Sequence, residues 1–144
     1  MRILVLNGPN LNLLGVREPG LYGTVDYDGL VALIQKECDA LGVQVRFYQS
    51  NHEGDLVDAI QAARLDCDGI VLNPGAYTHT SIAILDALKA VALPAAEVHI
   101  TDINQREGFR KVSYAGMACQ AHFIGQGLAG YLNAVRWLAG GSEQ

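Results

Sequence analysis

The chain alternates between short apolar runs and longer segments in which apolar residues recur every three or four positions. The apolar runs cover residues 2–6, 43–48, 69–73, 95–100 and 118–125. Runs of this length are typical of β-strands, and a continuous run such as residues 2–6 is typical of a strand that is covered on both faces of a parallel sheet. The pattern therefore predicts five strands.

Helical spacing fills the gaps between these strands. Asp26 can cap a helix that continues to about Leu41, where Gly42 ends it. The apolar spacing predicts three further helices: one that ends near Leu65, one from Ile82 that must end before Pro94, and residues 128–138.

Strands that alternate with helices require right-handed crossovers and a parallel sheet. We therefore expect a single domain over residues 1–144, with an α/β, flavodoxin-like fold. This fold is a three-layer sandwich around a five-stranded parallel sheet. The first and third strands are expected to be adjacent, which brings the loops that follow them together.

Composition and charge narrow the function classes. Half of the 144 residues are hydrophobic, the formal net charge is −5, and only ten Lys and Arg residues are spread along the chain. Nucleic-acid binding requires clustered basic residues, so we expect no nucleic-acid partner. No apolar run approaches the roughly 20 residues of a membrane-spanning helix, and the first residues do not resemble a signal peptide. We therefore expect no membrane partner and a cytoplasmic location.

The cysteines lack CxxC spacing and are expected to be buried free thiols: Cys38, Cys67 and Cys119.

Polar side chains gather where three predicted strands end. Asn7 and Asn10 follow the first strand, residues 73–81 follow the third, and residues 101–110 follow the fourth. The carboxyl ends of parallel strands are where open α/β sheets bind ligands, so these segments predict a site. A simpler interpretation also applies to the middle segment, in which Pro74-Gly75 is a turn and Thr78 or Ser81 caps the next helix.

Glu97 and His99 are two residues apart on one predicted strand, so both lie on the same side of the sheet, and Thr101 continues this period. A carboxylate next to an imidazole fixes its tautomer and raises its basicity, which suits a group that donates a proton. Two alternatives stay open, a structural pair and part of a metal site with His79. The chain has neither HxH nor HExxH spacing, so we expect no metal.

Two polar loops carry arginines. Residues 11–23 include Arg17 and Tyr22 and are predicted to form a lid, and the loop after the fourth strand carries Arg106 and Arg110. Two guanidiniums can stabilise a tyrosinate, which otherwise forms only near pH ~10. A further arginine can hold a substrate carboxylate. The alternative is that these arginines are simply solvated.

These groups suit metal-free removal of a proton beside a carbonyl, followed by elimination. The chain has no GxSxG elbow, which argues against acyl transfer. It has no GxxxxGK[ST] loop, which argues against nucleotide hydrolysis. Gly125, Gly127 and Gly130 match GxGxxG, but no acidic residue and no further strand follow at the required distance. We therefore expect no dinucleotide cofactor.

Ordered motifs cover essentially the whole chain: Gly8-Pro9-Asn10-Leu11-Asn12, Arg17-Glu18-Pro19, Tyr22-Gly23, Gln49-Ser50-Asn51, residues 73–81, Glu97-Val98-His99-Ile100, Arg106-Glu107, Phe109-Arg110 and Gly130-Tyr131. These motifs resemble the type II dehydroquinases (3-dehydroquinate dehydratases). The resemblance implies reversible dehydration of 3-dehydroquinate to 3-dehydroshikimate in the shikimate pathway, which leads to chorismate and the aromatic amino acids. It also implies anti elimination through an enolate, without metal or organic cofactor.

The resemblance further implies a role for each matching residue. Tyr22 is the base, activated by Arg17 with Arg106 nearby, and Asn10 holds the water that stabilises the enolate oxygen. The acid for the leaving hydroxyl is His99, which is oriented by Glu97. Side chains or backbone amides of five residues hold the substrate: Asn73, His79, Arg110, Ile100 and Thr101.

The family assembles trimers into a dodecamer, in which Asp86 would reach the site of a neighbouring subunit. His79 and Asp86 are seven residues apart, which is compatible with one face of a helix. Four positions depart from the family pattern, and the first is Thr101, which replaces a serine and retains a hydroxyl. Asp102 adds a carboxylate next to the anion site, which we expect to weaken substrate binding, and Gln120 and His122 replace apolar residues. A rival hypothesis is a non-catalytic, flavodoxin-like binding module that has kept the pocket.

Overall fold

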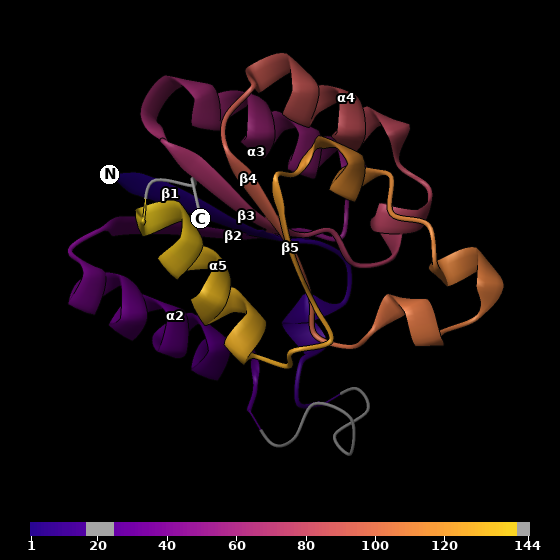
Figure 1. Cartoon of the computed structure of the whole chain (residues 1–144), viewed down its shortest axis with the longest axis horizontal. Coiled ribbons are helices and arrows are strands. Elements are labelled where there is room, and N and C mark those ends of the chain that lie inside the picture. Colours follow the sequence, from indigo (N-terminus) through magenta and orange to yellow (C-terminus); the bar gives the residue numbers. More distant parts are fainter. Residues whose placement is uncertain (17–24, 141–144) are drawn as a thin grey trace.

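The computed structural model describes residues 1–16 and 25–140, and these residues form one parallel sheet with helices on both faces (Figure 1). The strands lie in the order β2-β1-β3-β4-β5. Their bounds are Arg2–Asn7 for β1, Gln44–Gln49 for β2, Gly69–Asn73 for β3, Ala95–His99 for β4 and Ala121–Ile124 for β5. All four strand pairs are parallel. The predicted flavodoxin-like fold with adjacent first and third strands is confirmed.

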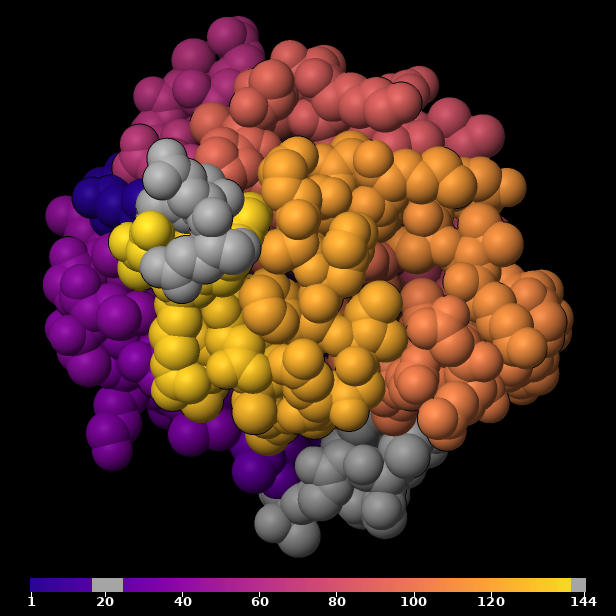
Figure 2. All heavy atoms as spheres, viewed as in Figure 1, coloured from indigo at the N-terminus to yellow at the C-terminus, as the bar shows by residue number. Residues whose placement is uncertain are grey.

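Two helices cover each face of the sheet, which gives three layers. One face packs against α2 (Tyr27–Leu41) and α5 (Ala129–Ala139), and the other packs against α3 (Glu53–Asp66) and α4 (Ile82–Val91). Figure 2 shows the side on which α5, in yellow, and the orange segment around β5 form the surface. The core is therefore divided between the two sides of the sheet.

Alternation along β1 explains this division. Ile3 and Val5 belong to the cluster under α2 and α5, whereas Leu4 and Leu6 belong to the cluster under α3 and α4. All four side chains are at most 1% exposed. Successive side chains of a strand point to opposite faces, so a continuous apolar run is the pattern that two covered faces require.

The ends of the helices follow from local residue types. The Asp26 carboxylate accepts a hydrogen bond from the Gly29 backbone N–H (2.8 Å), and Gly42 ends α2 with a φ of 71°. Ser81 caps α4 by accepting from Ile84 N–H (3.0 Å). The predicted start and end of α2 are confirmed, and the simpler interpretation of Ser81 as a helix cap is also correct.

The fifth strand is shorter than predicted. Residues 118–120 were expected to belong to it, but Ala115–Ala118 form the 3₁₀ helix η5, and β5 begins at Ala121. Gln120 instead accepts a hydrogen bond from the Ala95 N–H at Oε1 (2.8 Å). An apolar run alone does not distinguish a buried strand from a buried turn. Here the side chain of Gln120, instead of the backbone of a longer β5, accepts the hydrogen bond of the Ala95 N–H.

His79 and Asp86 do not share a helix. His79 ends the 3₁₀ helix η2 (Gly75–His79), and α4 begins only at Ile82, so the expected seven-residue face is wrong. All three cysteines are buried and free, as predicted. Within residues 1–16 and 25–140, no helix combines the length and the apolar character that a membrane span needs.

Candidate active site

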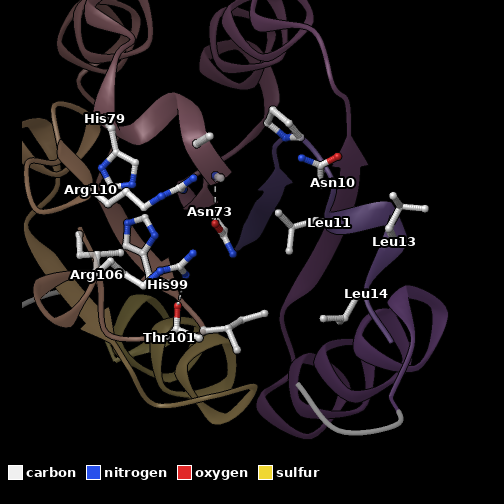
Figure 3. A pocket seen from close by; sticks show the side chains of 15 residues that line it. Asn10, Leu11, Leu13, Leu14, Asn73, His79, His99, Thr101, Arg106 and Arg110 are labelled. Carbon is white, nitrogen blue, oxygen red and sulfur yellow. Dashed lines mark hydrogen bonds between the residues drawn. The ribbon is translucent and has the colours of Figure 1, made fainter. Parts of the chain in front are cut away.

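A cleft of about 710 Å³, which includes open space at its mouth, lies at the carboxyl edge of the sheet (Figure 3). Its described walls come from the segments that follow β1, β3 and β4: Pro9, Asn10, Leu11, Leu13, Leu14, Asn73, Gly75, Ala76, His79, His99, Ile100, Thr101, Ile103, Arg106 and Arg110. This is the position in which the sequence predicted a site. The predicted site residues Asn10, Asn73, His79, His99, Ile100, Thr101, Arg106 and Arg110 all line it.

The loops after β1 and β3 are in direct contact. Gly8 N–H donates to the Asn73 carbonyl (2.8 Å), and a Cβ at Gly8 would lie 2.3 Å from the Pro74 carbonyl oxygen. Asn10 has a φ of 70°, and its backbone N–H donates to Asn51 Oδ1 (3.0 Å). Asparagine tolerates this left-handed conformation better than most residues. Close loop contact therefore sets the distance between Asn10 and Asn73 across the cleft.

A chain of buried hydrogen bonds fixes the Asn73 amide. Gly75 N–H donates to Asn73 Oδ1 (3.1 Å), and Asn73 Nδ2 donates to the Tyr131 hydroxyl (2.8 Å). Tyr131 in turn donates to Asn7 Oδ1 (2.6 Å) and is fully buried. Asn73 lines the cleft, so this network leaves it a second Nδ2–H to offer to a ligand.

Glu97 and His99 form a buried carboxylate–imidazole pair. Glu97 is 1% exposed, and its Oε2 lies 2.8 Å from His99 Nε2. Burial alone would raise the pKa of Glu97, but hydrogen bonds from His99, Ser113 and His122 outweigh it and lower the pKa to about 2. Glu97 is therefore an anion that orients His99, whose other ring nitrogen remains for a ligand.

Three residues that bond to site residues were not predicted as site residues. The Ser113 hydroxyl donates to Glu97 Oε2 and lies 2.7 Å from Thr78 Oγ1, and His122 Nδ1 donates to Glu97 Oε1 (2.7 Å). Tyr131 is the third, and it belongs to the separate hydrogen-bond network of Asn73. The departure of His122 from the expected apolar pattern was a usable signal. Tyr131 was noticed only as part of the Gly130-Tyr131 motif, without a role, and the loop serine gave no signal.

The cleft concentrates positive charge around His99. Figure 3 shows the His99 imidazole between the side chains of Arg106 and Arg110. Arg106 Nη1 donates to Thr101 Oγ1 (3.2 Å), and Arg110 Nε lies 3.1 Å from Glu107 Oε2. Guanidinium groups in a partly buried cleft favour a bound carboxylate.

His79 is a neutral hydrogen-bonding group in this arrangement. Its Nδ1 lies 2.7 Å from the Val112 carbonyl, which requires the proton on Nδ1. Burial and the nearby His99, Arg110 and Arg106 lower the pKa of His79. Its Nε2 therefore remains as an acceptor on the cleft side.

Four further predicted residues are not on the described walls of the cleft. Arg17 and Tyr22 lie outside the described residues, as does most of the predicted lid. Asp86 is exposed on α4 and is not among the described residues that line its own chain's cleft. Asp102, which was expected to add a carboxylate next to the anion site, is not among the described residues that line the cleft, and its Oδ1 accepts from Asn104 N–H (2.9 Å) at the start of η3 (Ile103–Gln105).

The same side chains bear on metal ligation. In the part of the chain that the structure describes, no group of three or more His, Cys, Asp or Glu could hold a metal ion. His79 is instead engaged by the Val112 carbonyl, and His99 is engaged by Glu97. The buried Glu97–His99 pair and the two arginines thus define an α/β protein with a cationic cleft at the carboxyl edge of its sheet.

Comparisons with known proteins place this site in a family. A family model described as "Dehydroquinase class II" matches residues 1–139. The chain is 52% identical over 137 residues to the 3-dehydroquinate dehydratase of Lachnospira eligens, covering 94% of this chain and 93% of that protein. It is 48% identical over 135 residues to that of Caldicellulosiruptor bescii, covering 93% of each. The chain therefore belongs to the class II dehydroquinase family.

Solved structures agree with this assignment. The type II dehydroquinase of Butyrivibrio crossotus superimposes with a TM-score of 0.93 at 50% identity, covering 96% of this chain and 97% of that one. A 3-dehydroquinate dehydratase-like protein of Bifidobacterium longum has a TM-score of 0.72 at 26% identity, with 100% and 99% covered. The fold and the order of its segments are thus those of the family over nearly the whole chain.

Proposed function

We propose that this protein dehydrates 3-dehydroquinate to 3-dehydroshikimate as a step of the shikimate pathway, through which chorismate and the aromatic amino acids are made. The observation that carries the proposal is the buried Glu97–His99 pair, in which His99 lines a cleft that also holds Arg106 and Arg110. Membership of the class II dehydroquinase family supports it. A proton donor next to an anion site is what elimination from a hydroxy acid requires.

The cleft offers a matching group for each polar part of the substrate. The substrate carboxylate would lie against Arg110 and the backbone amides of Ile100 and Thr101. Substrate hydroxyls would bond to the free Nδ2–H of Asn73 and to Nε2 of His79. One carboxylate and several hydroxyls thus meet cationic, donor and acceptor groups from the ends of two strands, β3 and β4.

The reaction would proceed by anti elimination through an enolate. Tyr22, as a phenolate stabilised by Arg17 and Arg106, takes a proton from the carbon beside the ketone, and the electron pair forms the enolate. A water held by Asn10 stabilises the enolate oxygen. The enolate then re-forms the ketone, the bond to the β-hydroxyl breaks, and His99 gives its proton to the leaving oxygen, which departs as water. The step needs neither a metal nor an organic cofactor.

We also propose that the protein works as a homo-oligomer in the cytoplasm, a dodecamer built of trimers. Asp86 is exposed on α4, away from its own chain's cleft, so it is free to reach the cleft of a neighbouring copy. The substrate is a small molecule, and neither nucleic acid nor membrane is involved.

The test is to incubate the purified protein with 3-dehydroquinate and to follow the absorbance of the conjugated enone product, with and without a chelator. We expect turnover that the chelator does not change. No absorbance change would overturn the proposal, and if dehydroquinate still bound, the protein would be a non-catalytic binding module. Loss of turnover with the chelator would instead indicate a metal-dependent reaction.

The same assay on Tyr22→Phe tests the base. Phenylalanine keeps the ring and removes the phenolic oxygen, so turnover should fall by ~10²–10⁴-fold, the usual cost of losing a general base. Turnover above about a tenth of the wild-type value, which is well outside that range, would assign proton removal to another group.

A further inference from the structure

Glu97 is bonded to two imidazoles, and only His99 belongs to the described wall of the cleft. Oε2 accepts from His99 Nε2 (2.8 Å), and Oε1 accepts from His122 Nδ1 (2.7 Å). Strand pairing creates this arrangement, because Glu97 of β4 lies opposite His122 of β5 in the sheet register. His122 can therefore reach a ligand in the cleft only through Glu97.

The carboxylate between these two rings has little freedom to move. Glu97 is 1% exposed, and the Ser113 hydroxyl also donates to Oε2. At Gly116 the backbone approaches so closely that a Cβ would lie 2.5 Å from Oε1. With both oxygens held, the plane of the carboxylate is fixed, and the orientation of His99 follows from it.

The hydrogen bond from His122 also withdraws negative charge from the Glu97 carboxylate. A second strong donor leaves a carboxylate with less negative charge to offer the imidazole on its other oxygen. Among the other ionisable groups here, the Cys119 thiol is neutral, because burial and the charge of Glu97 raise its pKa to about 12. Arg136 of α5 borders the same surface hollow as His122 and is engaged by Glu37.

We propose that His122 is a positioning residue for the acid group of the cleft. It fixes the Glu97 carboxylate and, by sharing its charge, weakens the hold of that carboxylate on the proton of His99. His99 becomes a better proton donor as a result. The inference rests on the proposed function, because that function assigns the acid role to His99. The His122 side chain is 44% exposed, so it contacts solvent that the buried Glu97 does not.

The first test compares His122→Val with His122→Asn across a pH series of kcat and KM. Valine removes the donor and suits a strand, whereas the asparagine Nδ2 can take the place of His Nδ1. We expect His122→Val to lower kcat by about tenfold, as loss of a supporting partner does elsewhere, with KM nearly unchanged. The alkaline limb of kcat should move to higher pH, and His122→Asn should restore most of both.

The matched control is His52→Asn, which removes an exposed histidine outside this network. Wild-type kcat and an unmoved alkaline limb in His122→Val would overturn the inference. So would a loss of kcat that His122→Asn does not restore, since that result indicates a purely structural role. If circular dichroism shows that His122→Val is unfolded, His122→Thr takes its place.

A second test does not depend on turnover. The chain has four histidines, so single substitutions assign each imidazole signal in an NMR titration. The titration midpoint of His99 should rise by about half a pH unit or more in His122→Val, and it should not move in His52→Asn. An unmoved midpoint would overturn the inference. A wild-type protein without dehydratase activity would overturn the proposed function while this titration still decides the role of His122.

Discussion

At the scale of single residues, the cleft depends on a few polar atoms whose partners lie far away in the sequence. Asn10, Asn73, His79, His99, and the two arginines could be predicted because they follow strand ends or keep a two-residue period. Ser113, His122 and Tyr131 could not be identified in the same way. Tyr131 is 58 positions from the amide that it holds, and the Gly130-Tyr131 motif marks the residue without indicating that its hydroxyl bonds to a site residue.

Ionisation of Glu97 should make the free energy of unfolding depend on pH in the acid range. Its pKa in the folded protein, about 2, lies below the usual 4.5, so the ionised carboxylate stabilises the fold above about pH 4.5 and this contribution is lost as pH falls toward 2. The full contribution is about 3 kcal/mol. We expect the free-energy difference of unfolding between wild type and Glu97→Gln to shrink by about this amount between pH 5 and pH 2.

Urea denaturation at several pH values measures this difference. Glu53→Gln, at the start of α3, is the control, and its difference from wild type should change far less over the same range. A difference for Glu97→Gln that is independent of pH would show that Glu97 is not held as an anion by its neighbours.

Asp102 yields a prediction that reverses the sequence-based expectation. The charge alone predicts that Asp102→Asn lowers KM, but Asp102 accepts from the Asn104 N–H, and an asparagine side-chain oxygen can do the same. We therefore expect KM for 3-dehydroquinate to stay within about twofold of the wild-type value, because the cap is kept. A clearly lower KM in steady-state kinetics would show that the carboxylate acts on the substrate after all.

At the scale of elements, the pattern of apolar residues predicted every strand of the described residues, and the choice of a flavodoxin-like fold predicted that β1 and β3 are neighbours. Its one clear error was the start of β5, where the residues of η5 are as apolar as a strand. Gly116 explains why a turn is needed there, since its backbone must approach Glu97. The apolar pattern indicates which residues are buried, but it does not indicate which polar atom bonds to a buried backbone group.

The contact between the loops after β1 and β3 can be broken with a single methyl group. A Cβ at Gly8 would lie 2.3 Å from the Pro74 carbonyl, so Gly8→Ala must separate the loops that carry Asn10 and Asn73. We expect it to cost about 2–4 kcal/mol of stability, as severe core strain does. It should also lower kcat/KM.

Gly54→Ala is the matched control for this substitution. Gly54 lies in α3 with open space around its Cβ position, so alanine should stabilise the helix by about 0.5–1 kcal/mol. Thermal unfolding and initial rates of both variants measure the contrast. Equal stability of the two variants would mean that the loops can part without cost.

At the scale of the whole molecule, one chain does not explain the exposed position of Asp86 on α4. If Asp86 completes the cleft of a neighbouring copy, light scattering should show an oligomer. Asp86→Ala and His99→Ala should each have low activity. When the two variants are dissociated, mixed and reassembled, about a quarter of the sites should combine an intact His99 with an intact Asp86 of the neighbouring copy, because the subunits pair at random. A fully active monomer, or a mixture no more active than its parts, would contradict the proposed assembly.

The position of Tyr131 late in the chain has a consequence for folding during translation. Asn7 and Asn73 leave the ribosome early, but the group that joins them belongs to α5, the last helix among the described residues. A nascent chain that stops before α5 already contains every described residue of the cleft wall, yet it leaves these amides without the Tyr131 hydroxyl and one face of the sheet covered by α2 alone. Interrupted translation should therefore yield fragments that carry the catalytic groups without an ordered cleft, so that activity arises only once synthesis is nearly complete.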